Sequence, residues 1–182
     1  MALTQIDPVA ALVVIDLQKG IAGLPLAHPT HEIVARTAEL LRAFRARNLP
    51  VVLVNVAGRP PGRTDVKMEF TPPPDWTDLV PELDRQPGDH LVTKMNIGAF
   101  YGTALERILR RHHATQIFLT GVATSVGVET TAREAFDYGY NVVTVVDAMT
   151  DRDADTHRYT LEKVFPRISE TTTTAQLLAL LK

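Results

Sequence analysis

The 182-residue sequence contains no cysteine. Disulfide bonds, thiolate metal ligands and a thiol nucleophile are therefore all excluded. The sequence also has no run that approaches the roughly 20 apolar residues needed to span a bilayer. Its first ten residues carry no basic segment followed by a long apolar stretch, so we expect no signal peptide. These absences favour a cytoplasmic protein without a membrane partner.

A surplus of positive charge is also lacking, because the formal net charge is −2. We therefore expect no nucleic-acid partner, since binding to phosphates needs a basic surface. The densest basic stretch, residues 107–113, is typical of the carboxyl end of a helix. The chain length and an ordinary globular composition predict a single domain over residues 1–182.

Six apolar segments are typical of strands. The clear ones are apolar at consecutive positions, which indicates strands buried on both faces of a parallel sheet. Between most of them, apolar residues recur at helical spacing, and Gly139 is placed to end the third helix. We predict strands over residues 11–17, 51–56, 90–93, 116–120, 141–146 and 167–169, and helices over residues 31–48, 103–113, 125–138, 153–164 and 173–181.

Strands that alternate with helices predict a three-layer α/β/α fold with a doubly wound, mainly parallel, six-stranded sheet. The expected strand order is 3-2-1-4-5-6, a Rossmann-like arrangement. It places strands one and four side by side and opens a crevice beyond their carboxyl ends. Residues 57–89 are rich in proline and match neither pattern. They fit an ordered flap over the crevice or a purely structural wrap, and Trp76 argues against disorder.

Two charged residues stand at predicted strand ends. Asp16 follows the apolar run Val-Val-Ile at 13–15, and Lys94 follows Leu-Val-Thr at 91–93. A carboxylate is costly to bury without a partner, and the end of a central strand faces the ligand crevice of such folds. Taken singly, each residue also fits an ordinary structural role. Asp16 could cap a loop, and Lys94 could be an edge residue with its ammonium in solvent.

The segment 121–133, Gly-Val-Ala-Thr-Ser-Val-Gly-Val-Glu-Thr-Thr-Ala-Arg, leads from the fourth strand into a helix. Backbone N–H groups at a helix start can hold an anion or an oxyanion. The same segment also fits an ordinary turn with Thr124 or Ser125 as the N-cap.

The three pieces in this order resemble the isochorismatase-like hydrolase superfamily over nearly the whole chain. The resemblance rests on the Asp16 strand, on Lys94 before the Gly-Ala-Phe segment at 98–100, and on residues 121–133. The superfamily's catalytic triad is Asp, Lys and Cys, so it implies catalytic roles for Asp16 and Lys94. The cysteine falls at Gly127. The resemblance also implies a cis peptide bond between Val122 and Ala123.

Isochorismatases resemble this variant because they too carry glycine where relatives carry cysteine. They hydrolyse a vinyl ether without a covalent intermediate, which implies that Asp16 acts as a general acid. Lys94 would bind a substrate carboxylate or orient Asp16. A nearby ammonium lowers the pKa of a carboxyl group, so burial must outweigh Lys94, or the substrate must neutralise it, for Asp16 to hold a proton. Ser125 and Thr124 have no evident base beside them.

The expected substrate-binding residues lie near these segments and are Gln18, Trp76, Phe100, Tyr101, Val122, Ala123, Thr124 and Gly127. No cofactor is expected. No metal is expected either, because residues 54–59 lack the Asp-x-His pair of nicotinamidases and the histidines lack carboxylate partners at ligand spacing. Relatives assemble as dimers or tetramers, which implies a homo-oligomer. A non-catalytic ligand-binding or structural protein is the alternative to a small-molecule hydrolase.

Overall fold

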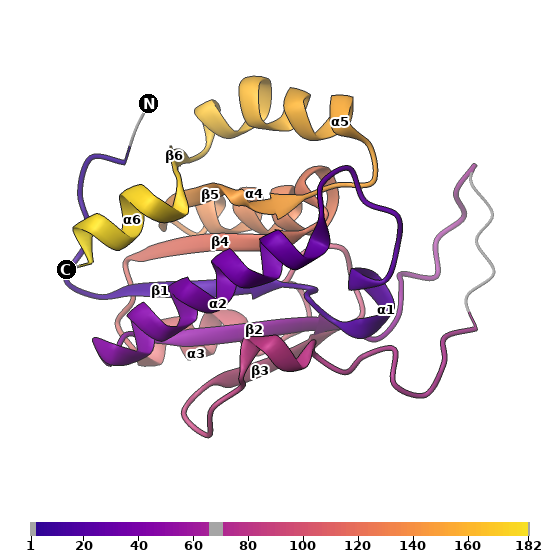
Figure 1. Ribbon diagram of the computed structural model, residues 1–182, viewed down its shortest axis with the longest axis horizontal. Coiled ribbons are helices and arrows are strands. Elements are labelled where there is room, and N and C mark those ends of the chain that lie inside the picture. The colour runs from indigo at the N-terminus through magenta and orange to yellow at the C-terminus, as the bar shows by residue number, and fades with distance from the viewer. Residues whose placement is uncertain (1–2, 66–70, 182) are drawn as a thin grey trace.

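The computed structural model describes residues 3–65 and 71–181. Its centre is one six-stranded sheet in the order β3-β2-β1-β4-β5-β6, with every neighbouring pair parallel (Figure 1). This order confirms the predicted 3-2-1-4-5-6 arrangement. The strands are β1 (Ala10–Ile15), β2 (Val51–Val56), β3 (His90–Lys94), β4 (Gln116–Val122), β5 (Asn141–Thr150) and β6 (Glu170–Thr172).

The central strands are buried because helices cover both faces of the sheet. On one face, α2 (Thr30–Ala46) and α6 (Thr174–Leu180) pack against alternate residues of β1, β2, β4 and β5. On the other face, α3 (Leu105–Arg111) and α4 (Glu129–Asp137) pack against the intervening residues. All residues of β1 and β4 are buried, which explains their continuous apolar runs.

The predicted helices are present with shorter or divided bounds. The third begins as a π-helical turn, Thr124–Val128, before α4, and it ends where Gly139 adopts a φ of 83°. The fourth begins as α5 (Ala154–Tyr159) and continues as a second π-helical turn, Thr160–Val164. A short helix that the periodicity did not predict, α1 (Lys19–Ala22), lies beyond the end of β1 (Figure 1).

The predicted last strand, at 167–169, is wrong. Residues Phe165–Arg167 form a 3₁₀ turn around Pro166, which cannot donate to a strand ladder. The strand is β6, a few residues later, where Glu170 pairs with Val143 and Thr172 with Val145 at the sheet edge. An edge strand needs little apolar character, so its polar sequence gave no signal.

The described parts of segment 57–89 form one 3₁₀ turn, Pro81–Leu83, and otherwise irregular backbone. The segment is tied to the start of α1, where the amides of Lys19 and Gly20 donate to the carbonyls of Asp78 and Trp76. Its residues 57–65 and 71–79 lie at the carboxyl ends of the strands, on the right of Figure 1. Among the described residues, no helix combines the length and apolar character needed to cross a bilayer.

Candidate active site

A cavity of about 360 Å³ lies at the carboxyl ends of β1, β3, β4 and β5. Asp16 directly follows β1, Lys94 ends β3, and Gly127 lies in the turn after β4; all three line the cavity. Parallel pairing therefore brings together residues that are more than a hundred positions apart. The crevice predicted beside strands one and four is this cavity.

Asp16 is held at the end of β1 in an unusual backbone conformation. Its φ is 52°, in the left-handed region that aspartate tolerates better than most residues, and its amide donates to the carbonyl of Val54 at 2.9 Å. The side chain is buried, and Oδ2 lies 2.9 Å from Nζ of Lys94. Oδ1 has no hydrogen-bond partner among the described residues.

Burial and the neighbouring ammonium act in opposite directions on Asp16. Burial disfavours the carboxylate and is the larger effect, whereas the charge of Lys94 and its hydrogen bond favour the carboxylate. The balance raises the pKa of Asp16 from 3.8 to about 6. A substantial fraction of Asp16 is therefore protonated just below neutral pH, as a general acid requires.

The side chain of Lys94 is 2% exposed. Its ammonium group contacts Oδ2 of Asp16 and donates to two backbone carbonyls, those of Asn96 at 3.2 Å and Ile97 at 2.7 Å. An ammonium has three donors, so these contacts account for all of them. Lys94 is therefore fixed on Asp16 and on the loop that follows its own strand.

The turn after β4 passes very close to β1. A side chain at Gly121 would collide with the backbone of Ile15, because a Cβ there would lie 2.0 Å from the Ile15 carbonyl oxygen. The peptide bond between Val122 and Ala123 is cis, as the resemblance implied. At Gly127, a Cβ would lie 3.1 Å from Cγ2 of Ile15 and 3.4 Å from Oδ2 of Asp16. A side chain at residue 127 would therefore crowd the acid and the strand before it.

The predicted N-caps of the following helix are wrong. Neither Thr124 nor Ser125 caps it with its side chain. The amide of Ser125 instead donates at 2.7 Å to Oδ2 of Asp151, just beyond β5, and Oδ1 of Asp151 accepts from the amide of Arg152 at 2.7 Å. A carboxylate at the amino end of this turn is favourable for the helix dipole. That amide is consequently occupied and does not hold a substrate oxyanion.

The Thr124 side chain is buried away from the cavity and bonds to a histidine. Its Oγ1 lies 2.8 Å from Nδ1 of His157, whose ring centre is 4.7 Å from that of His28 with the two rings tilted by 58°. Burial, and secondarily His28, lower the pKa of His157, although Asp151 opposes them. The turn that carries Gly127 is thus fixed from two sides, by His157 and by Asp151.

Among the other predicted binding residues, Val122 and Ala123 line the cavity. Gln18 does not line it, because its buried side chain accepts from the amide of Val56 and donates to the carbonyls of Val56 and Trp76. The indole of Trp76 packs over Gly20, where even a Cβ would lie 1.9 Å from it. Gln18 and Trp76 therefore hold segment 57–89 against α1.

The two aromatic residues predicted as pocket walls also lie outside the cavity lining. Phe100 is buried in the core, with its ring 5.1 Å from that of Tyr138 and 6.0 Å from that of Tyr140. Tyr101 is 74% exposed. Aromatic side chains are most often core residues, and the sequence carried no information on which way this loop turns them.

Several lining residues have no counterpart among the predictions. Two arginines and a carboxylate, Arg59, Arg152 and Asp151, line the cavity, and much of the remaining wall is apolar. Asp151 directly follows β5, but the apolar run at 141–146 is followed by Asp147, so the reasoning applied to Asp16 would have selected Asp147 instead. The arginines lie on irregular backbone, where periodicity gives no signal. Within residues 3–65 and 71–181, no three His, Asp or Glu side chains converge to hold a metal ion.

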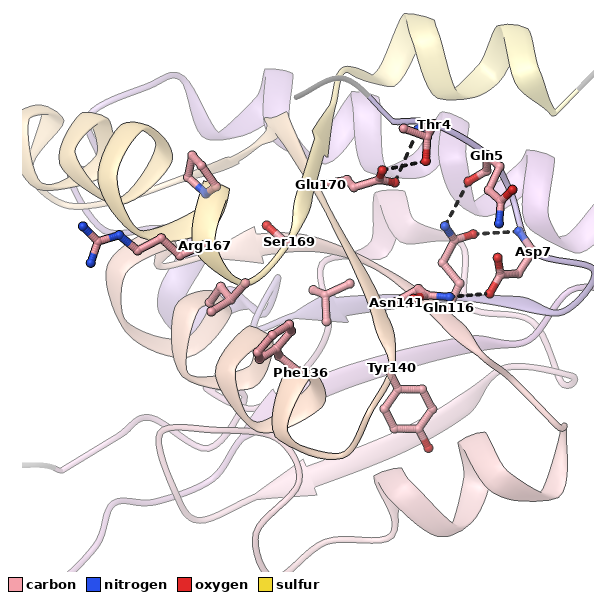
Figure 2. Close-up of a pocket in the computed structure, with 13 residues that line it drawn as sticks. Thr4, Gln5, Asp7, Gln116, Phe136, Tyr140, Asn141, Arg167, Ser169 and Glu170 are labelled. Carbon is pink, nitrogen blue, oxygen red and sulfur yellow. Dashed lines mark hydrogen bonds between the residues drawn. The ribbon is translucent and has the colours of Figure 1, made fainter.

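A second cavity, of about 340 Å³, lies at the amino ends of β4 and β5 (Figure 2). Several of its polar side chains are bonded to one another and to the amino-terminal segment. Glu170 accepts from Thr4, the Gln116 side chain bonds to Gln5 and Asp7, and Asn141 donates to Asp7. These contacts attach the amino-terminal segment to the sheet. The cavity beside Asp16 differs because a buried ion pair, Asp16 with Lys94, lines it.

The chain is similar to known proteins over almost its whole length. The isochorismatase domain model matches residues 10–176. The isochorismatase family protein YwoC of Bacillus subtilis is 40% identical over 181 residues, which cover 94% of each chain. The structure of an isochorismatase family protein from Burkholderia thailandensis superposes with a TM-score of 0.88 at 44% identity, covering 97% of each chain.

A more distant similarity is to the N-carbamoylsarcosine amidase of Thermoplasma acidophilum. The TM-score is 0.74 at 27% identity, and the match covers 91% of this chain and 96% of the amidase. The domain model matches residues 10–176, and each of these similarities covers more than 90% of the chain. The chain belongs to the isochorismatase family, within the isochorismatase-like hydrolase superfamily.

Proposed function

We propose that this protein hydrolyses a vinyl ether of a small molecule, without a covalent intermediate, with Asp16 as the general acid. The observation that carries the proposal is the state of the Asp16 side chain. It is buried beside Gly127, it lines the cavity, and its pKa is raised to about 6. A carboxyl group in this condition can donate a proton near neutral pH.

The reaction balances with water as the only co-substrate. Asp16 gives its proton to the terminal carbon of the vinyl group and forms a C–H bond. Water then adds to the resulting oxocarbenium-like carbon. The hemiketal breaks its C–O bond to release an alcohol and a carbonyl compound, and the proton freed from water restores the acid. Lys94 stabilises the carboxylate that forms between these steps, since it stays within contact of Oδ2.

Thiolate attack on an amide is excluded for this chain, whatever its relatives do. N-carbamoylsarcosine amidase acts on an amide by name, but none of the 182 residues here is a cysteine. The vacant position at Gly127 therefore supports a reaction that needs an acid and water rather than a nucleophilic side chain.

The test is an assay of wild type and Asp16→Asn on isochorismate, a simple vinyl ether and simple amides. We expect hydrolysis of the vinyl ethers by wild type and a loss of at least about a hundredfold in kcat for Asp16→Asn, the usual range for removal of a general acid. Asp155→Asn, an exposed residue paired with Arg158, is the matched control and should leave kcat unchanged.

The alternative is a non-catalytic protein that binds a small molecule in the same cavity. Gly127, in the position of the nucleophile, is the observation that favours it. If wild type and Asp16→Asn hydrolyse the panel equally slowly, the hydrolase proposal is wrong and this alternative remains.

A further inference from the structure

The described side chains that line the cavity include more cations than carboxylates. The cations are Arg59, Lys94 and Arg152, and the carboxylates are Asp16 and Asp151. These five groups carry an excess of one positive charge when both carboxylates are ionised, and of two when Asp16 holds its proton. A partly enclosed site with such an excess attracts and retains an anion.

Lys94 cannot be the group that binds this anion. Its ammonium is buried, and its three donors are taken by Asp16 and by the carbonyls of Asn96 and Ile97. To contact a substrate anion, it would have to release one of these partners inside a region that water does not reach. Such a loss leaves a buried polar group unsatisfied and is costly.

Arg152 is placed differently. Arg152 follows Asp151 just beyond β5, lines the cavity and is exposed. Its backbone amide is held by Oδ1 of Asp151, which fixes the start of the side chain. No Asp or Glu lies within ion-pair distance of its guanidinium among the described residues. A guanidinium presents paired donors that match the two oxygens of a carboxylate.

The wall beside these charges is apolar. Ile21 and Leu24 come from α1 and the turn after it, Val56 from β2, and Val126 from the π-helical turn. An excess of positive charge, the guanidinium of Arg152 and an apolar wall together select for a particular kind of molecule. It fits a small apolar body that bears a single carboxylate.

We infer that the ligand of this cavity is a small monocarboxylate whose acid group binds to Arg152, while Lys94 stays on Asp16. This inference rests on the proposed function for the identity of the site, and it adds the charge of the substrate and the residue that selects it. Arg152 thereby determines specificity, and Asp16 performs the chemistry.

Binding provides a test that does not depend on turnover. Cyclohexanecarboxylate and its neutral counterpart cyclohexanecarboxamide are titrated calorimetrically into wild type, Arg152→Gln and Arg158→Gln. Arg158 is a matched control, since it is an exposed arginine on the neighbouring helix α5, paired with Asp155. We expect Arg152→Gln to weaken binding of the acid by about 10- to 100-fold, the range of a charge-assisted hydrogen-bonded pair. Binding of the amide should be unchanged, and Arg158→Gln should behave as wild type.

Turnover gives a second test. On the enolpyruvyl ether of cyclohexanol, Arg152→Gln should raise KM with kcat nearly unchanged, whereas on its methyl ester neither constant should change. Equal binding of the acid by wild type and Arg152→Gln would overturn the inference. If Asp16→Asn still abolished turnover in that case, the proposed function would survive. Loss of acid binding in Arg152→Gln without turnover by wild type would support the inference and refute the hydrolase.

Discussion

Oδ2 of Asp16 lies 3.4 Å from the position that a Cβ would occupy at Gly127. The same Cβ would lie 3.1 Å from Cγ2 of Ile15, which is fully buried in β1. Any side chain at residue 127 therefore presses on the acid and on the strand that carries it. The glycine is needed for the space that it leaves.

For Gly127→Ala, we expect a decrease of about 1–2 kcal/mol in the free energy of unfolding, the typical cost of overpacking a rigid core. We also expect the added methyl group to lower kcat/KM on vinyl ethers by about tenfold, since it displaces substrate or water from Asp16. Gly88→Ala is the control, because a Cβ at Gly88 would meet nothing within 4 Å. Denaturant unfolding and steady-state kinetics measure both effects. Full activity in Gly127→Ala would show that the space is not used.

The activity should depend on pH through Asp16. Its pKa is raised to about 6 mainly by burial. The acid is active only when protonated, so kcat/KM should be constant well below pH 6 and fall about tenfold per pH unit above it. The measurement is a pH profile in buffers of constant ionic strength. A profile that rises through pH 6 would mean that the carboxylate, acting as a base, is the active form.

Lys94→Met should affect both stability and this profile. Breaking a buried ion pair leaves an uncompensated charge and costs about 3–5 kcal/mol of unfolding free energy at neutral pH. Lys94 lowers the pKa of Asp16, so its removal should raise that pKa further and move the decline in activity to higher pH. Lys19→Met is the control, because Lys19 is exposed and pairs with Asp75 and Asp78 at the surface. A Lys94→Met profile shifted to lower pH would contradict the assignment.

Asp151 and Asp153 form a matched pair of helix caps. Asp151 caps the turn that carries Gly127, whereas Asp153 caps α5 by accepting from the amide and hydroxyl of Thr156. Each change to alanine should cost about 1 kcal/mol of unfolding free energy, the usual value of an N-cap. Only Asp151→Ala should also lower kcat/KM, by about tenfold, because only that turn positions Gly127 beside Asp16. Equal kinetics in the two variants would show that the cap is merely structural.

The continuous apolar runs of the strands were sufficient to predict a parallel sheet. The meeting of Asp16 with Lys94 was predicted from the resemblance to the superfamily, since each residue alone also fitted an ordinary structural role. A search for a carboxylate after the apolar run at 141–146 would have selected Asp147 rather than Asp151. The last strand was misplaced because Glu170–Thr172 is polar and short, and pairing with β5 alone defines it.

The residues that form the cavity wall were harder to predict from the sequence than Asp16. Phe100 and Tyr101 are adjacent, yet one is in the core and the other is in solvent. Their directions depend on how the loop after β3 is held by Lys94, and that contact exists only in the folded protein. Arg59 and Arg152 lie on irregular backbone, so only the folded chain places them at the cavity.

The buried carboxamide of Gln18 joins β1, the end of β2 and the backbone at Trp76. The amide of Ala57 is likewise anchored to the carbonyl of Lys94. The connection between β2 and β3 is therefore attached to the sheet at Ala57 and again at Trp76. Gly58, Arg59 and Pro60, just after the first attachment, line the cavity. Substitutions at these three positions would reshape the cavity wall while Asp16 kept its surroundings. New substrate preferences can thus arise from this short stretch without any change in the catalytic residues.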